Sequence, residues 1–152
     1  MIQIKVVCVG NLKEKFWKDG VDEYLKRLSK FCKITIVELA EQNKYQDIEK
    51  IKEMEGKEIL NNLQGKCYLL DIHGKELSSE DFAKEIASAA LESSTLTFII
   101  GGSYGVSAQV KEKVPNKISF GRITLPHNLA RLVLVEQIYR CFMIQSGSTY
   151  HK

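Results

Sequence analysis

The sequence predicts an α/β fold in which a mainly parallel sheet is flanked by helices. Short segments rich in Ile and Val alternate along the whole chain with longer amphipathic segments, which is the order that βαβ units produce. Two short segments, 96–100 and 118–120, each end in a glycine-marked loop, as strands of an open α/β sheet do at a ligand site. With 152 residues, 44% of them hydrophobic and 27% charged, we expect one globular domain over residues 1–152.

The first half of the chain is expected to form two strand–helix units. Residues 2–9 alternate and then become continuously apolar before a Gly-Asn pair, which predicts a strand. An apolar stripe predicts a helix over 14–30, where Gly20 costs about 1 kcal/mol relative to Ala and marks a point at which the helix could kink. A second strand is expected at 34–39, and a charged helix at 47–62 follows a polar loop.

The middle of the chain predicts two more strands with a helix between them. We expect the strands at 66–71 and 96–100 because both segments are short, apolar and bounded by polar residues or glycine. Ser78 or Ser79 caps the intervening helix, which runs to Glu92. Two acidic residues in its first turn suit the positive end of the helix dipole.

The last third predicts a short helix, a short strand and a long helix. Ser107 caps the short helix, which ends near Lys113 before a proline, and residues 117–120 form the fifth strand. Pro126 stands where the final helix begins, and this helix runs to Gln145. It is apolar around most of its circumference, whereas a surface helix needs only one apolar stripe. We therefore expect part of it to form a twofold homodimer interface.

The glycine loops predict a ligand site. Residues 101–105 follow one strand and residues 121–127 follow the next, so backbone amides of both loops lie at the same edge of the sheet. Neither loop matches the G-x-G-x-x-G or the GK[ST] phosphate fingerprint. A lone glycine loop is more often a simple turn, but two of them with apolar surroundings suit an adenosine held by backbone contacts without a phosphate cradle.

Charge and cysteine usage exclude several classes. The net charge of +3 divides into about +4, −6 and +5 over 1–33, 34–93 and 94–152, a pattern that by itself favours an ordinary patchwork of solvated charge. Four scattered cysteines without a CxxC pair predict buried, reduced thiols in a cytoplasmic protein and no metal site. No uncharged stretch reaches the roughly 18–20 residues of a membrane span, so we expect no membrane partner.

Four segments together resemble one known family. They are Ile99-Ile100-Gly101-Gly102-Ser103-Tyr104-Gly105, Phe120-Gly121-Arg122-Ile123-Thr124-Leu125-Pro126-His127, the helix segment 131–140, and the closing Tyr150-His151-Lys152. They are similar to the RlmH family, the SPOUT-class methyltransferases that act on N3 of a pseudouridine in the ribosomal RNA of the large subunit. The resemblance covers the whole chain, including the Val-Gly loop near the N-terminus and the Leu-Asp-x-x-Gly stretch at 70–74.

The resemblance implies a fold, a cofactor and partners. The fold is an α/β domain with a C-terminal trefoil knot, an exception to unknotted topology. The methyl donor is S-adenosylmethionine, and the enzyme is a homodimer in the cytoplasm that methylates 23S ribosomal RNA on the assembled 70S ribosome. The cofactor positions that the resemblance implies are Leu70, Gly101, Phe120, Gly121, Arg122, Ile123, Thr124 and Leu125.

Three residues are the candidates for the chemistry. N3 of pseudouridine carries a proton, so a general base or a cation that stabilises the uracil oxygens would help the transfer. His151 is the first candidate because histidine titrates near neutral pH, although chain ends are commonly disordered. Tyr150 could stack on the base, donate to it or simply pack, and Arg122 could face RNA phosphate, a uracil oxygen or only solvent. His127 is a second-rank candidate. Arg131 and Arg140 could hold interface carboxylates or RNA, and the dimer interface is favoured.

Two readings from other classes remain open at this stage. One is a ribosome- or RNA-binding module without catalysis, and the other is a small-ligand protein of flavodoxin-like type. The chain lacks the interleaved aromatic and basic residues of single-strand RNA platforms, which weakens the first alternative. Binding of S-adenosylmethionine would separate the methyltransferase from both.

The apolar final helix generates a prediction about oligomeric state. We expect analytical ultracentrifugation at micromolar concentration to give the mass of two chains, because an apolar face left in water would favour self-association. A single species with the mass of one chain would contradict the predicted interface.

Overall fold

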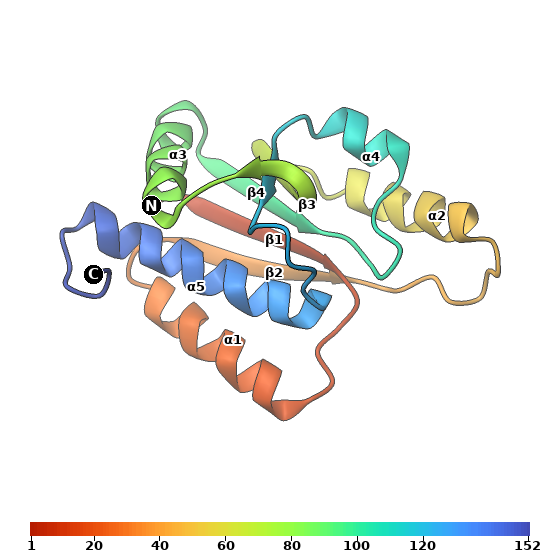
Figure 1. Cartoon of the computed structure of the whole chain (residues 1–152), viewed down its shortest axis with the longest axis horizontal. Helices are drawn as coiled ribbons and strands as arrows, with labels where there is room; N and C mark the ends of the chain where they lie inside the picture. The colour runs from red at the N-terminus through yellow and green to blue at the C-terminus, as the bar shows by residue number, and fades with distance from the viewer.

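The computed structural model describes all residues, 1–152, and has helices on both faces of one five-stranded sheet (Figure 1). The strands are β1 (Gln3–Val9), β2 (Lys33–Leu39), β3 (Lys66–Glu76), β4 (Thr95–Ile100) and β5 (Lys117–Ser119). The helices are α1 (Lys15–Leu28), α2 (Ile48–Leu60), α3 (Ser79–Glu92), α4 (Ala108–Lys113) and α5 (His127–Gln145). The predicted α/β class and the order of elements are confirmed.

The sheet is parallel throughout and has the strand order β2-β1-β4-β3-β5. All six residues of β4 are buried, as expected for a central parallel strand that is covered on both faces. The chain returns from β4 across β3 to reach β5, so β5 lies at an edge beside β3. The flavodoxin-like alternative is wrong, because that fold has the order 2-1-3-4-5.

Two apolar cores cover the two faces of the sheet. Alternate residues of β1 and β4, such as Val6 and Phe98, pack beneath α1, α3 and α5. Their neighbours in sequence, such as Val7 and Ile99, pack against the layer of α2 and α4. The alternation follows from the two-residue period of a strand, which sends successive side chains to opposite faces. Leu134 and Ile138 of α5 are fully buried in the first core.

Helix α5 lies between α1 and α3 (Figure 1). Every residue from 127 to 144 is buried or partly buried within the single chain. Much of the apolar circumference of the helix is therefore covered by α1, α3 and the sheet of the same chain, and the homodimer interface remains a prediction. The outermost residues keep partial exposure, and only these are left for a partner.

Two local predictions need correction. Helix α1 continues without a break through Gly20. A Cβ atom added at this position would lie 3.2 Å from the side chain of Leu132 in α5. Glycine there permits close packing of the two helices. Strand β3 extends to Glu76, beyond the predicted end at 71, and its register with β5 shifts between Leu70 and Lys75.

The cysteines and the absence of metal clusters bear on the predicted site chemistry. Cys8, Cys32 and Cys141 are buried free thiols, whereas Cys67 is partly exposed, so the prediction of burial fails at one position. Burial raises the pKa of the Cys8 thiol to about 11.

No group of three or more His, Cys, Asp or Glu side chains is arranged to hold a metal ion. None of the helices has the length and apolarity that a bilayer crossing requires.

The packing of α5 on the sheet predicts the cost of a cavity. We expect Leu134→Ala, at a fully buried position, to lower the free energy of unfolding by about 3 kcal/mol. The matched variant Leu91→Ala, at a position that is 90% exposed, should change it by less than about 0.5 kcal/mol. Urea denaturation followed by circular dichroism at one protein concentration measures both, and equal effects would contradict the assigned core.

Candidate functional site

A cavity of about 620 Å³ lies at the carboxyl ends of β4 and β5, over residues 70–72 of β3 and beside the first turn of α5. Its walls are these residues of β3, the ends of β4 and β5 with the loops that follow them, and Pro126, His127 and Ala130. Eight of its 18 lining residues are hydrophobic. The location agrees with the rule that open α/β sheets bind ligands outside the carboxyl ends of their strands.

The first wall is the loop after β4. Gly102 accepts a hydrogen bond from the backbone N–H of Gly105 at 3.0 Å, which closes a tight turn. A Cβ atom on Gly101 would lie 2.6 Å from the side chain of Val106, so glycine is required here by the packing of the loop itself. On the outer side Gly102 rests against Glu55 of α2. Burial raises the pKa of Glu55.

The second wall is the loop after β5, and Ser119 holds it in place. The Ser119 hydroxyl donates to the carbonyl of Ile72 at 3.1 Å and accepts from the N–H of Gly121 at 3.1 Å. Gly121 has a φ of +108°, which side-chain-bearing residues rarely adopt. A Cβ at Gly121 would meet no atom within 4 Å, so the backbone borders open space.

The structure brings most of the predicted cofactor positions together. Seven of the eight line this one cavity: Leu70, Gly101, Phe120, Gly121, Ile123, Thr124 and Leu125. Arg122 belongs to the same loop but is exposed and is not among the lining residues. His127, ranked second on sequence, does line the cavity. Its position directly after the loop, at the start of a helix, was the available signal.

A second, polar pocket of about 700 Å³ adjoins the cavity, and the two share Ser103 and His127. It is formed by the loops after β1 and β2 and carries three carboxylates, Glu14, Glu38 and Glu41. His127 Nε2 lies 3.8 Å from Glu41 Oε1. The carboxylates make this pocket attractive to cations and unattractive to phosphate groups.

Tyr150 and His151 are not among the residues that line the cavity of the same chain. The cavity adjoins the first turn of α5, whereas both residues follow its C-terminal end (Figure 1). The tail folds back along the helix as far as Glu136, at its middle. Of the three predicted catalytic residues, only Arg122 belongs to a loop that forms the cavity.

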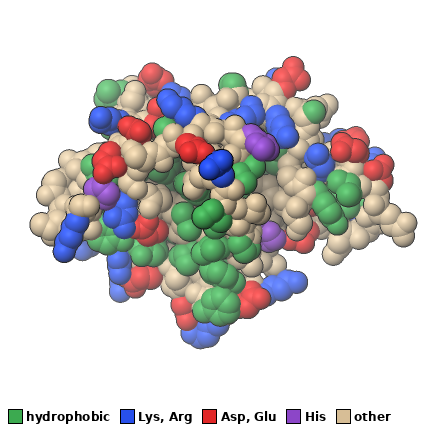
Figure 2. Space-filling view, viewed as in Figure 1, with side chains coloured by type: hydrophobic (Ala, Val, Ile, Leu, Met, Phe, Trp, Pro, Cys, Tyr) green, Lys and Arg blue, Asp and Glu red, His purple; other side chains and the backbone are tan.

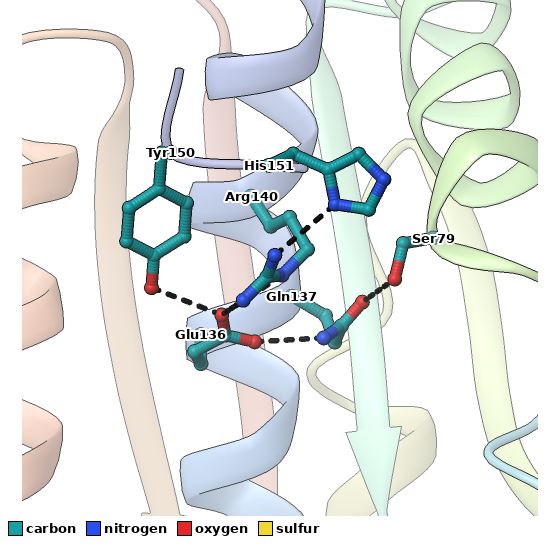
Figure 3. A network of polar contacts seen from close by, with 6 residues as sticks. All are labelled: Ser79, Glu136, Gln137, Arg140, Tyr150 and His151. Carbon is teal, nitrogen blue, oxygen red and sulfur yellow. Dashed lines mark hydrogen bonds and ion pairs between the residues drawn. The ribbon is translucent and has the colours of Figure 1, made fainter. Parts of the chain in front are cut away.

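A network of polar contacts holds the C-terminal residues on α5 and α3 (Figure 3). The Tyr150 hydroxyl donates to Glu136 Oε1 at 3.0 Å, and Arg140 donates to the same oxygen from Nε at 3.0 Å and from Nη2 at 2.7 Å. His151 Nδ1 lies 3.1 Å from Arg140 Nη1, and its Nε2 lies 2.7 Å from Glu80 Oε1. Burial, followed by hydrogen bonds with Tyr24 and Glu136, raises the pKa of Tyr150.

The partners of His151 define its tautomer. Arginine can only donate hydrogen bonds, so Nδ1 of His151 accepts from Arg140 and its proton resides on Nε2, which donates to Glu80. In this state the lone pair of Nδ1 is occupied. His151 can serve as a general base only after Arg140 has moved away from it.

Sequence reasoning favoured the dimer interface for Arg140 and assigned no role in the site to Glu80 or Glu136, two other members of this network. Glu80, Glu136 and Arg140 now surround the two tail residues. The spacing of Glu136 and Arg140, four residues apart on a helix, was a visible signal for an ion pair. Nothing in the sequence indicated that the chain end folds back onto it.

Arg131 is a correction to the interface prediction. Its side chain is buried within the chain, where it donates to Glu38 Oε2 at 2.6 Å and to the carbonyl of Gly10 at 3.1 Å. It thereby joins α5 to the loop after β1 and to the end of β2. Arg131 therefore stabilises the packing inside one chain and is not available to a second chain.

Comparisons with known proteins agree with this architecture. The model of a family described as predicted SPOUT methyltransferases matches residues 2–151. A protein from Lactobacillus gasseri named ribosomal RNA large subunit methyltransferase H is 50% identical over an alignment of 159 positions, which covers 99% of this chain and all of the relative. Proteins of the same name from Streptococcus uberis and Latilactobacillus sakei are each 48% identical over the same coverage.

The contact between His151 and Glu80 predicts a titration shift. The hydrogen bond from His151 lowers the pKa of Glu80, so the contact is present at neutral pH and is lost as the pH falls through that lowered value. We expect ¹³C NMR of the Glu80 carboxyl to show a pKa below the usual value of about 4.3, and His151→Ala to return it towards that value. An unchanged titration in His151→Ala would contradict the docked tail.

Proposed function

Because this chain belongs to the SPOUT methyltransferase family, we propose that it methylates N3 of a pseudouridine in the 23S ribosomal RNA, with S-adenosylmethionine as the methyl donor. The cavity built from residues of β3 and the loops after β4 and β5 is the single observation that carries the proposal. The family implies the C-terminal trefoil knot. We treat residues 1–152 as one domain, since the family match spans 2–151.

The cavity residues fit the proposed donor. Its apolar lining, with Leu70, Phe120 and Leu125, suits the face of an adenine ring, and the open space beside Gly121 allows the ligand to approach the backbone. Backbone N–H and C=O groups of the loop 120–125 would then form hydrogen bonds with the polar edge of the adenine ring. Bound there, S-adenosylmethionine supplies a methyl group on a cationic sulfonium.

The adjoining polar pocket suits the cationic end of the donor. Glu14 and Glu41 place negative charge in this pocket, which also holds Lys13, whereas Glu38 is already paired with Arg131. The remaining carboxylate charge favours the sulfonium and ammonium groups of a ligand. Ser103 and His127 stand at the junction of the two spaces. Fixing both ends of the donor would aim its methyl group, and alignment supplies much of the rate in a transfer of this kind.

A homodimer resolves the separation of Tyr150 and His151 from the cavity. If two copies of α5 pack antiparallel about a twofold axis, the C-terminal tail of one chain lies beside the cavity of the other. Hydrophobic side chains gather over the N-terminal halves of α5 and α1 (Figure 2). Ile123 and Phe16 are 79% and 64% exposed, and a second copy would remove them from water. Each complete site would then contain residues of both subunits.

The tail supplies the groups that act on the acceptor base. Methyl transfer to N3 needs its proton removed, and His151 can accept that proton at Nδ1 once Nη1 of Arg140 exchanges His151 for a uracil oxygen, while Nε and Nη2 stay on Glu136. The guanidinium of Arg140 would stabilise the negative charge that develops on the uracil oxygens. Tyr150 would stack on the base, because its one hydroxyl hydrogen is donated to Glu136. Exposed Arg122 would contact RNA at the rim of the site.

The proposed partner is the assembled 70S ribosome in the cytoplasm. A net charge of only +3 gives weak attraction to RNA in general, so recognition would depend on a shaped ribosomal surface more than on phosphate contacts. The relatives that share about half of their sequence with this chain carry names that specify ribosomal RNA of the large subunit.

Two measurements test the proposal. Isothermal titration calorimetry with S-adenosylmethionine should show saturable binding, and mass spectrometry should find one additional methyl group on a 23S pseudouridine after incubation with ribosomes from a strain that lacks this protein. Binding without methylation would retain the donor site and overturn the proposed acceptor. Absence of binding would overturn the donor assignment.

The packing of Gly101 predicts a loss of donor binding. We expect Gly101→Val to displace Val106, because the added Cβ would lie 2.6 Å from it, and to weaken S-adenosylmethionine binding by at least about tenfold. Ala87→Val, on the exposed face of α3, is the matched control and should bind normally. Wild-type affinity in Gly101→Val would contradict the assigned wall.

The shared site predicts complementation between two inactive variants. Gly101→Val damages the cavity and His151→Ala damages the tail, so neither homodimer should methylate ribosomes. After the two are mixed and allowed to exchange subunits, one site in each mixed dimer is intact, and activity should return to about a quarter of the wild-type value. A mixture that stays inactive despite confirmed subunit exchange would show that the tail acts elsewhere.

A further inference from the structure

Glu136 is the centre of the network that holds the chain end (Figure 3). Its Oε1 atom accepts three hydrogen bonds, two from Arg140 and one from the Tyr150 hydroxyl. Its Oε2 atom accepts from Gln137 Nε2 at 2.7 Å. Only 18% of the Glu136 side chain is exposed. Both carboxylate oxygens are therefore engaged inside the chain.

The partners of Glu136 are themselves fixed. Gln137 accepts a hydrogen bond from the Ser79 hydroxyl of α3 at 2.6 Å, which ties the carboxylate to a second helix. The Arg140 guanidinium lies 4.8 Å from the centre of the Tyr150 ring, and this ring packs edge-on against Tyr139. Glu136 thus sets the position of one cation and one hydroxyl with respect to each other.

A second ion pair in the chain shows that Glu136 has more partners than the carboxylate of an ordinary helix ion pair. Glu23 and Arg27 of α1 have the same spacing of four residues, and Arg27 Nε donates to Glu23 at 2.8 Å. Glu23 has no further side-chain partner in another element, and its side chain is 50% exposed. Exposed ion pairs of this kind contribute little to stability. Glu136 differs because it also binds a residue two places from the chain end.

The chain end would otherwise be free. Terminal residues are usually disordered unless they are tied down, and Tyr150 and His151 are followed by a single residue. Fixing them in advance removes an entropy cost that would otherwise be met when the acceptor base binds. Glu136 does not line the cavity, and most of its side chain is buried.

We infer that Glu136 is a positioning residue for methyl transfer, which holds Arg140 and Tyr150 in the geometry that acts on the acceptor base. This inference rests on the proposed function. It assigns Glu136 no contact with the donor or with the RNA. The carboxylate acts through its three hydrogen bonds to Arg140 and Tyr150, and its loss would leave the guanidinium and the phenol without a fixed relative orientation.

Steady-state methylation of ribosomes from the strain that lacks the protein tests this role. We compare Glu136→Gln, which keeps the shape but removes the charge, with Glu23→Gln as the matched control on α1. Glu136→Gln should lower kcat by at least about tenfold while the KM values for ribosomes and for S-adenosylmethionine change less than about twofold. Glu23→Gln should have wild-type kinetics.

A double-mutant cycle separates positioning from an independent role. If Glu136 acts through Tyr150 and Arg140, adding Glu136→Gln to Tyr150→Phe should lower kcat much less than Glu136→Gln does alone. If the fold-losses in kcat of the two single variants multiply in the double variant, the inference is overturned. A wild-type kcat in Glu136→Gln would overturn it as well. Should Glu136→Gln fail to fold by circular dichroism, Glu136→Asp is measured instead against the same criteria, because its shorter side chain cannot reach both partners.

The outcomes remain distinct from those that test the proposed function. A wild-type protein that transfers no methyl group to ribosomes overturns the proposed function and this inference with it. A wild-type protein that is active, together with a Glu136→Gln variant of equal kcat, overturns the inference alone.

Discussion

Helix α5 imposes the distance on which the arrangement of the site depends. Its 19 residues form a rod of about 28 Å, which is packed between α1, α3 and the sheet. The cavity adjoins the first turn of the rod, whereas the Glu136 network lies at its middle and the tail follows its far end. Tyr150 and His151 do not line the cavity of their own chain, so the proposed chemistry would draw on two chains.

The cavity owes its shape to topology more than to any one side chain. Parallel strands present their carboxyl ends at one edge, and the return of the chain across β3 brings the loop after β5 to face the loop after β4. The tie from Ser119 to Ile72 and Gly121 then fixes the second wall against β3. Gly101 permits the close packing of the first loop, and Gly121 leaves the second loop open towards the cavity.

The pattern of the sequence predicted what depends on local periodicity. Buried strands such as 96–100 and the caps at Ser78 and Ser107 follow from neighbours in sequence, and the structure has them where expected. The reason for Gly101 was not predictable, because its contact with Val106 exists only once the loop has folded. The same holds for Gly20, whose role is to admit Leu132 from a helix more than 100 residues away.

The candidate site shows the same limit more sharply. The residues that line the cavity could be named from their motifs, but burial of Arg131 against Glu38 and Gly10 was not foreseeable from a helix pattern. Nor was the docking of Tyr150 on Glu136, which joins residues of a tail and a helix through side-chain geometry alone. Periodicity reports which face of an element is apolar, and it carries no information about which polar partner a side chain meets across the fold.

The electrostatics of the two ends argue for their different tasks. Carboxylates border the polar pocket beside the cavity, where the proposed donor is cationic, whereas Arg140 stands at the tail, where negative charge would develop on the acceptor base. Both groups already have partners within the chain, since Glu38 pairs with Arg131 and Arg140 pairs with Glu136. In the proposed dimer a second chain would bring cavity and tail together, so that assembly would also bring together the charges that the reaction needs.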